Sequence, residues 1–119
     1  MNRKAVVDKA HLDALRKFKA DVFQVLAHPT RIHIIETLRD GELSVGAIME
    51  RVNVEPANLS QHLAILRSKR LVKHRKAKNQ VFYSLRNAFL TEVLDIMRQY
   101  FLAHLEEDVG MLQTMEQEK

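Results

Sequence analysis

The sequence predicts one mostly helical domain, residues 1–119, that contains a single small β-hairpin. Apolar residues recur at three- and four-residue steps over most of the chain, which is the helical period. Two short runs between residues 71 and 85 break that period and read as strands, the second being rich in β-branched and aromatic residues. A chain of 119 residues with 46% apolar residues is sized for one small core.

A proline separates the first two predicted helices. Apolar residues over 7–26 follow the helical period, and His28 ends this helix because the residue before a proline disfavours the helical backbone. Pro29 then suits the first position of a second helix, which ends at Asp40-Gly41. Its predicted inward face consists of Ile32, Ile35 and Leu38.

A helix-turn-helix is predicted at about residues 44–69. Ser44 suits the N-cap of a short third helix that runs through Val52. Residues 53–55 read as a turn, and Pro56 opens a fourth helix that reaches about Lys69. The fourth helix has a polar outer face, which is typical of the second helix of such a motif. Its inward stripe consists of Leu59, Leu63 and Leu66.

The hairpin, at about residues 71–85, and a long final helix complete the prediction. The two strand-like runs cover 71–76 and 80–85, and between them Asn79 tolerates the positive φ that hairpin turns require. The last helix runs from Asn87 to about Thr114 and has apolar residues on more than one face. A helix of that kind needs two partners, which indicates its own core and a second subunit.

Positive charge is concentrated in one segment. No acidic residue lies between Pro56 and Thr91, whereas the whole chain has 19 Lys plus Arg and 15 Asp plus Glu, a net charge of +4. The segment's basic residues are Arg67, Lys69, Arg70, Lys73, Arg75, Lys76, Lys78 and Arg86. Outside the segment the charge is negative. A positive surface on a negative body favours a polyanion such as nucleic acid, and a solvated run of charge is the alternative.

Several classes of function are excluded or disfavoured. The chain has no cysteine, which excludes disulfides, thiolate metal sites and thiol redox switching. Its three glycines form no phosphate-binding loop, and no catalytic motif is present, so an enzyme is not expected. No apolar run approaches the roughly 20 residues of a membrane span, and no signal pattern begins the chain. We therefore expect a cytoplasmic protein that has no membrane contact.

Two motifs resemble those of the ArsR/SmtB-type bacterial repressors. They are VLAHPTRIHII at residues 25–35 and LSQHLAILR at 59–67, the latter followed by Leu71-Val72 and a hairpin that includes Tyr83. The resemblance covers residues 25–85. It implies a homodimeric winged helix-turn-helix that dimerises through its first and last helices, binds double-stranded operator DNA as a repressor, and often releases it when a ligand binds.

The fourth helix and the hairpin carry the candidate DNA contacts. Gln61 and Asn58 have amides that match the hydrogen-bonding edge of adenine in the major groove. Ser60 suits a phosphate or a local cap. The side chains that suit phosphates, which fix register without reading sequence, are Arg67, Lys73, Arg75 and Lys78. Solvated surface residues are the alternative reading, and His62, nearer the inward stripe, is expected to be structural.

The candidate dimer interface lies on the first and last helices. It consists of Phe18, Val22, Val93, Met97, Tyr100 and Phe101. Two-fold symmetry predicts that the operator is an inverted repeat, with half-sites about 10 base pairs or a multiple apart.

The sensor sites of the resembled family are missing or incomplete. Ser44 and Gly46 stand at the positions of the metal-binding cysteines, and neither supplies a thiolate. A second family site uses acidic and histidine ligands on the final helix, and here only His104 and Glu107 remain of it. Two ligands are too few for a tetrahedral zinc site, so no metal and no cofactor is expected.

Two alternatives are kept. One is a metal-responsive repressor with a histidine and carboxylate site on the terminal helices. The other is a winged-helix module whose acid-free surface meets an acidic protein instead of DNA.

Overall fold

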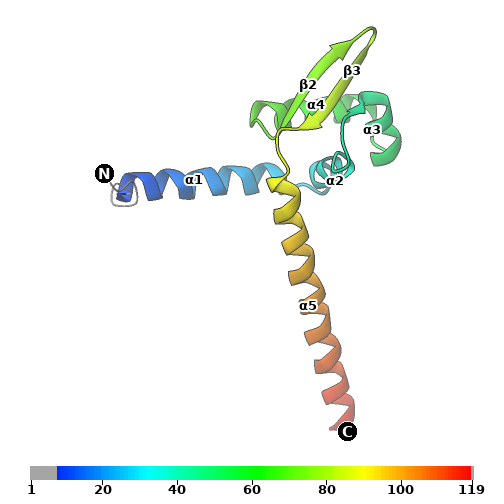
Figure 1. Cartoon of the computed structure of the whole chain (residues 1–119). Coiled ribbons are helices and arrows are strands. Elements are labelled where there is room, and N and C mark those ends of the chain that lie inside the picture. The colour runs from blue at the N-terminus through cyan, green and yellow to red at the C-terminus, as the bar shows by residue number, and fades with distance from the viewer. Residues whose placement is uncertain (1–7, 119) are drawn as a thin grey trace. The chain divides into compact units, whose positions relative to one another are not determined.

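The computed structural model describes residues 8–118, which fall into two compact units, one up to Arg86 and one from Asn87 onwards (Figure 1). The first unit contains α1 (Lys9–Leu26), α2 (Pro29–Thr37), β1 (Leu43–Ser44), α3 (Val45–Val52), α4 (Pro56–Ser68), β2 (Val72–Ala77) and β3 (Gln80–Leu85). The second unit consists of α5 (Phe89–Gln117). The fold is thus mostly helical with a small sheet, as predicted.

Side chains at the helix ends explain where the helices begin. The carboxylate of Asp8 and the hydroxyl of Ser44 each accept a hydrogen bond of 3.1 Å from the amide three residues further on, which caps α1 and α3. His28 caps α2 through its Nδ1 atom. Pro29 and Pro56 occupy the first turns of α2 and α4, where the missing N–H costs nothing. The predicted starts of the second, third and fourth helices are confirmed.

The core of the first unit is aliphatic and is formed by α2, α3, α4 and the sheet. Its fully buried side chains are Ile34, Ile35, Leu38, Ile48, Leu59, Leu63, Leu66 and Val72. The predicted inward stripe of α4 is confirmed. The predicted face of α2 was partly wrong, because Ile34 is fully buried and Ile32 is only half-buried. The cause is that α2 contacts three helices, α1, α3 and α4, so its apolar surface is wider than one stripe.

The sheet has three antiparallel strands in the order β1-β3-β2. The predicted hairpin is confirmed, and its register pairs Val72 with Leu85 and Ala77 with Gln80. β1 was not predicted, because its two residues are too few to show an alternating pattern. This short strand pairs with β3 through Leu43 and Tyr83 and joins the hairpin to the start of α3.

The hairpin turn differs from the expectation in one backbone angle. Lys78, the first of its two loop residues, has the positive φ of 58°, whereas Asn79 does not have a positive φ. A positive φ at the first loop position is the pattern of a type II′ turn, one of the two that match the twist of paired strands. Lys78 therefore sits at the turn itself, where its side chain is exposed.

α5 is a single helix of 29 residues that runs a few residues past the predicted end. Asn87 accepts a hydrogen bond of 3.0 Å from the amide of Phe89 at its start. Apolar side chains are exposed along the helix, including Met97, Tyr100 and Phe101, which are 55%, 76% and 56% exposed. None of the helices within residues 8–118 is long and apolar enough to cross a membrane.

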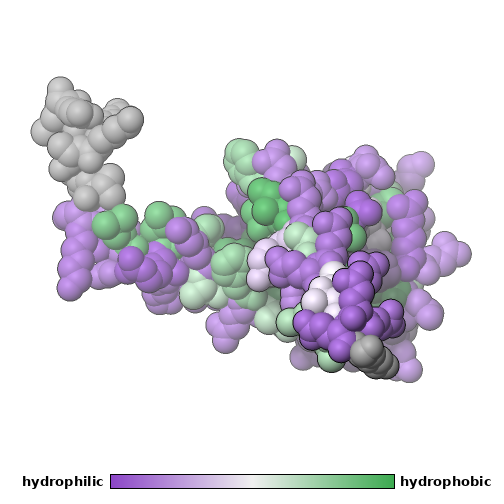
Figure 2. Space-filling view, turned by 90° about the horizontal axis from the view of Figure 1, so that it is seen from below, coloured by the Kyte–Doolittle hydropathy of each residue, from purple (hydrophilic) through white to green (hydrophobic). Residues whose placement is uncertain are grey.

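α1 also exposes apolar side chains, which lie among charged ones along the helix that extends to the left in Figure 2. Leu12, Leu15, Phe18 and Phe23 are all about half exposed or more, while Val22 is half-buried. α1 in the first unit and α5 in the second unit therefore both carry exposed apolar side chains.

Candidate nucleic-acid interface

Two open grooves border α4, one on each side of its exposed face. The wing groove, of about 600 Å³, lies between α4, the start of α3 and the hairpin. It is lined by Ser44, Val45, Gly46, Ser60, Leu63, Ala64, Arg67, Asn79, Gln80, Val81 and Tyr83. The turn groove, of about 590 Å³, lies between α4, the turn before it and the start of α2. It is lined by His28, Thr30, Asn53, Val54, Glu55, Asn58, Gln61 and His62.

The helical period of α4 divides the candidate DNA contacts between these grooves. Ser60 and Arg67 are seven residues apart, which is two turns, and both line the wing groove. Asn58 and Gln61 are three residues apart and line the turn groove. All four side chains are exposed. The outer face of α4 thus presents two amides on one side and a hydroxyl and a guanidinium on the other.

Histidine and arginine side chains anchor α4 to α2 beside the turn groove. Arg31 Nε donates a hydrogen bond of 3.2 Å to His62 Nδ1, and the rings of His62 and His28 lie 4.4 Å apart. Burial, followed by the charges of His28 and Arg31, lowers the pKa of His62. A neutral, half-buried ring with two neighbours agrees with the structural role expected for His62.

The strand alternation sorts the basic residues of the hairpin onto two faces. Val72 is buried, so His74 and Lys76 share its face, which is the face toward α4. Arg67 Nη1 lies 3.1 Å from His74 Nε2, which confirms the direction of this face. Lys73 and Arg75 occupy the opposite face.

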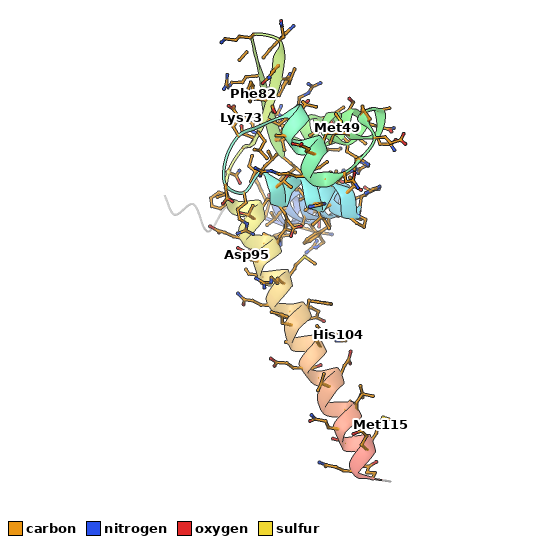
Figure 3. All side chains as sticks on the ribbon, turned by 90° about the vertical axis from the view of Figure 1, so that its right-hand side faces the viewer. Met49, Lys73, Phe82, Asp95, His104 and Met115 are labelled. Carbon is orange, nitrogen blue, oxygen red and sulfur yellow. The ribbon has the colours of Figure 1, made fainter. Side chains whose placement is uncertain are left out.

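Arg75 is held by an acidic partner. Its Nε and Nη2 atoms donate to the two carboxylate oxygens of Glu42 at 2.8 and 2.5 Å, and its guanidinium lies 4.8 Å from the centre of the Phe82 ring. This bidentate pair raises the pKa of Arg75 and lowers that of Glu42, and the charge of Lys73 lowers the pKa of Glu42 further. Figure 3 labels Lys73 and Phe82 on the hairpin.

The structure therefore separates Lys73 and Arg75 from the other candidate phosphate contacts. Both lie beside Glu42, on the hairpin face away from α4, where the carboxylate offsets part of their charge. Arg67 lines the wing groove, and Lys78 stands at the hairpin turn next to the groove residue Asn79.

Sequence reasoning did not select several residues that the structure places beside α4. They are Thr30 in the turn groove, His74 and Lys76 on the hairpin face toward α4, and Asn79 and Gln80 in the wing groove. A signal for two of them was present. Counting alternate residues from the apolar Val72 would have assigned His74 and Lys76 to the inward face.

The candidate sensor residues have other partners or roles. Ser44 caps α3. His104 Nε2 lies 3.6 Å from the Asp108 carboxylate, on the exposed surface of α5. Over residues 8–118, no three His, Cys, Asp or Glu side chains are grouped as a metal site requires.

Comparisons with known proteins agree with this geometry. The family described as "Bacterial regulatory protein, arsR family" matches residues 28–74. The uncharacterized HTH-type transcriptional regulator Rv0081 of Mycobacterium tuberculosis is 36% identical over 104 residues, which cover 87% of this chain and 91% of that protein. The crystal structure of Rv0081 has a TM-score of 0.72 at 38% identity and covers 80% of this chain and 96% of its own.

Two further comparisons extend the match. The biofilm growth-associated repressor of Xylella fastidiosa is 32% identical over 84 residues, which cover 71% of this chain and 74% of that protein. The solution structure of the homodimeric winged helix-turn-helix DNA-binding domain Mb0332 from Mycobacterium bovis has a TM-score of 0.70 at 25% identity, over 83% of this chain and 94% of its own.

The match to residues 28–74 spans α2, α3, α4 and the start of β2. It includes all residues that line the turn groove and the α3 and α4 residues that line the wing groove. The chain therefore belongs to the arsR family of bacterial regulatory proteins, and it is a DNA-binding transcription regulator with a winged helix-turn-helix.

Proposed function

We propose that this regulator is a homodimeric repressor that binds an inverted-repeat operator, with α4 in the major groove of each half-site and the hairpin along the DNA backbone. The observation that carries the proposal is the exposed polar face of α4 between two grooves, one of them bordered by the hairpin. A recognition helix needs such a face to reach base edges while flanking elements hold the backbone.

The candidate residues on α4 and at the hairpin turn each have a place in this arrangement. Gln61 reads a base edge, and Asn58, on the same side of α4, reads a neighbouring one. Ser60, Arg67 and Lys78 bind phosphates along the wing groove. Lys76, which the hairpin register turns toward α4, joins them.

The dimer follows from apolar surface that one chain leaves exposed. Phe18 on α1 and Met97, Tyr100 and Phe101 on α5 are all more than half exposed. Val93, one or two turns before them on α5, is 38% exposed. Exposed apolar residues in this number favour burial against a second copy, and the related Mb0332 domain is a homodimer. A two-fold dimer places two copies of α4 about one helical turn of DNA apart.

The signal that this regulator senses does not involve thiol chemistry, since the chain has no cysteine. We propose that no metal or other cofactor is needed for operator binding. A regulator of this kind acts where the chromosome lies, and we therefore place it in the cytoplasm.

The test is to immobilise the protein, pass sheared genomic DNA over it, and sequence what it retains. The proposal predicts one enriched inverted repeat, and a mobility shift with that repeat which Gln61→Ala weakens far more than it weakens binding to random DNA. Retention of no enriched DNA sequence would favour the protein-interaction module instead. Release of the DNA by micromolar zinc, abolished in His104→Ala, would favour the metal-responsive repressor.

A further inference from the structure

The guanidinium of Arg31 connects three helices of the first unit. Arg31 lies in the first turns of α2, and its Nε atom donates to His62 of α4 at 3.2 Å. Its Nη1 atom donates at 3.1 Å to the main-chain carbonyl of Val25, in the last turn of α1. Both hydrogen bonds are partly buried, so water competes with them less than at the surface.

The hydrogen bond from Arg31 to the Val25 carbonyl, at the C-terminal end of α1, is electrostatically favourable. The last carbonyls of a helix have no partner within it and carry partial negative charge. No residue in the last turn of α1 is basic, and the positive charge there comes from Arg31 of the next helix. Val25 itself is buried, at 6% exposed. The rigid fork of a guanidinium holds both acceptors at once, which the single ammonium of a lysine does not do with fixed geometry.

The α4 end of the connection lies next to the base-reading position. His62 follows Gln61 directly, and both line the turn groove with His28 and Asn58. Nδ1 of His62 accepts from Arg31, and Nδ1 of His28 accepts from the Thr30 amide, so these hydrogen bonds hold the two rings side by side. A small shift of His62 therefore moves Gln61 with it.

We propose that Arg31 is a positioning residue for DNA recognition, which fixes the orientation of α4 against α1 and so sets where Gln61 meets its half-site. The inference rests on the proposed function, in which α1 forms part of the dimer interface. In such a dimer, the angle between α1 and α4 sets the distance from the two-fold axis to each recognition helix. Arg31 then determines the half-site spacing that the dimer prefers.

The direct test is Arg31→Met, which keeps an unbranched apolar stem in place of the aliphatic part of arginine and removes the donors. We expect affinity for the operator to fall roughly ten-fold or more, in the range of lost hydrogen bonds to a charged group. The preference for the natural spacing over spacings one base pair longer or shorter should fall with it. Affinity for random DNA and the dimeric state should be unchanged. Arg51→Met, an exposed arginine on α3, is the matched control and should leave all four quantities unchanged.

A double-mutant cycle identifies His62 as the partner. His62→Leu removes the acceptor and should act like Arg31→Met, whereas His62→Gln keeps an acceptor and should retain most of the spacing preference. In the Arg31→Met background, His62→Leu should have no further effect on that preference. Full additivity of the two substitutions would overturn the proposed connection.

A pH series provides a readout that a purely structural role of Arg31 would not give. A protonated His62 has no acceptor for Arg31. The spacing preference of the wild-type protein should therefore weaken as pH falls through the lowered pKa of His62, which lies below the ordinary histidine value of about 6.5. The charged and titratable groups around His62 are His28 and Arg31 from α2 and Glu55 from the turn. His62→Gln should remove this pH dependence, and His74→Gln on the hairpin should keep it.

Besides full additivity in the double-mutant cycle, three further outcomes would overturn the inference: wild-type spacing preference in Arg31→Met, an equal loss on random DNA, or an unchanged pH dependence in His62→Gln. If Arg31→Met fails to fold, the pH series on the wild-type protein and on His62→Gln is sufficient by itself to test the role of the hydrogen bond between Arg31 and His62. A wild-type protein that shows no spacing preference at all would instead contradict the proposed function.

Discussion

Lys73 and Lys76 form a matched pair for locating the DNA, because they have the same chemistry, lie on the same strand and are both exposed. They differ in the face of the hairpin from which they project and in their distance from the turn, since Lys73 pairs with Ser84 and Lys76 pairs with Val81. Lys76 lies on the face of the buried Val72, toward α4, and Lys73 lies beside Glu42 on the opposite face. If the backbone of DNA follows the wing groove, Lys76→Ala should change binding and Lys73→Ala should not.

The size of the effect follows from counterion release. Each neutralised phosphate contributes about 0.9 to the slope of log affinity against log salt. A dimer presents two copies of Lys76, so Lys76→Ala should lower the slope by about 1.8. Over a ten-fold range of salt this corresponds to roughly a 60-fold difference in affinity relative to the wild-type protein. Lys73→Ala should change the slope by less than about half a unit.

The assay is fluorescence anisotropy with a labelled operator duplex at a series of salt concentrations. Random duplex DNA of the same length serves as the control, and it should show the same change in slope because phosphate contacts do not read sequence. Equal effects of the two substitutions, or a larger effect of Lys73→Ala, would refute the assignment of the inward hairpin face to DNA.

Four further predictions concern base recognition by Gln61, the burial of Leu59, the ion pair of Glu42 with Arg75, and dimer formation through Met97. Gln61→Ala should cost about 1–3 kcal/mol for the preferred operator and relax discrimination at one base pair, which a panel of single-substituted duplexes measures; a uniform loss on random DNA would contradict base reading. Leu59 is fully buried, so Leu59→Ala should destabilise the fold by about 2–5 kcal/mol in urea unfolding, and a cost below about 1 kcal/mol would contradict the packing of α4. Arg75 lowers the pKa of Glu42. The ion pair therefore stabilises the fold fully above the ordinary Glu pKa of about 4.3, and this stabilisation is lost as pH falls through the lowered pKa of Glu42. Glu42→Gln should therefore show a smaller loss of thermal stability on acidification, and an identical pH profile would refute the pair's contribution. Met97→Glu should give monomers by light scattering that bind the operator far more weakly, and an unchanged dimer would remove this part of α5 from the interface.

Local signals predicted the helix-turn-helix well, because the residues that define it act on their immediate neighbours. Ser44 caps α3 through an amide three residues away, and Pro56 begins α4 by its own ring geometry. The buried face of α4 was visible in the sequence because Leu59, Leu63 and Leu66 recur at the helical period. These interactions are local, so a sequence displays them directly.

The contacts that organise the interface could not be predicted, because they join residues far apart in the chain. Arg31 meets His62 across 31 positions, and Glu42 meets Arg75 across 33. Arg75 looked like a phosphate ligand from its charge alone, and only the fold shows an acid beside it. The two-residue β1 and the positive φ of Lys78 have no period or composition that would reveal them.

The central claim is that α4 enters the major groove of two symmetric half-sites. The absence of cysteine from the chain makes a direct measurement simple, because a single introduced cysteine is the only site for a thiol-reactive DNA-cleaving reagent. Ala64 is exposed on the outer face of α4 and Lys78 is exposed at the hairpin turn, so Ala64→Cys and Lys78→Cys label the two elements separately.

With the operator bound, the Ala64→Cys reagent should cut in two clusters related by the two-fold axis, about 10 base pairs or a multiple apart. The Lys78→Cys reagent should cut in two clusters at different positions along the same duplex, on the same symmetry axis. One unpaired cluster from Ala64→Cys, or cutting spread evenly along the duplex, would contradict recognition by a symmetric pair of α4 helices.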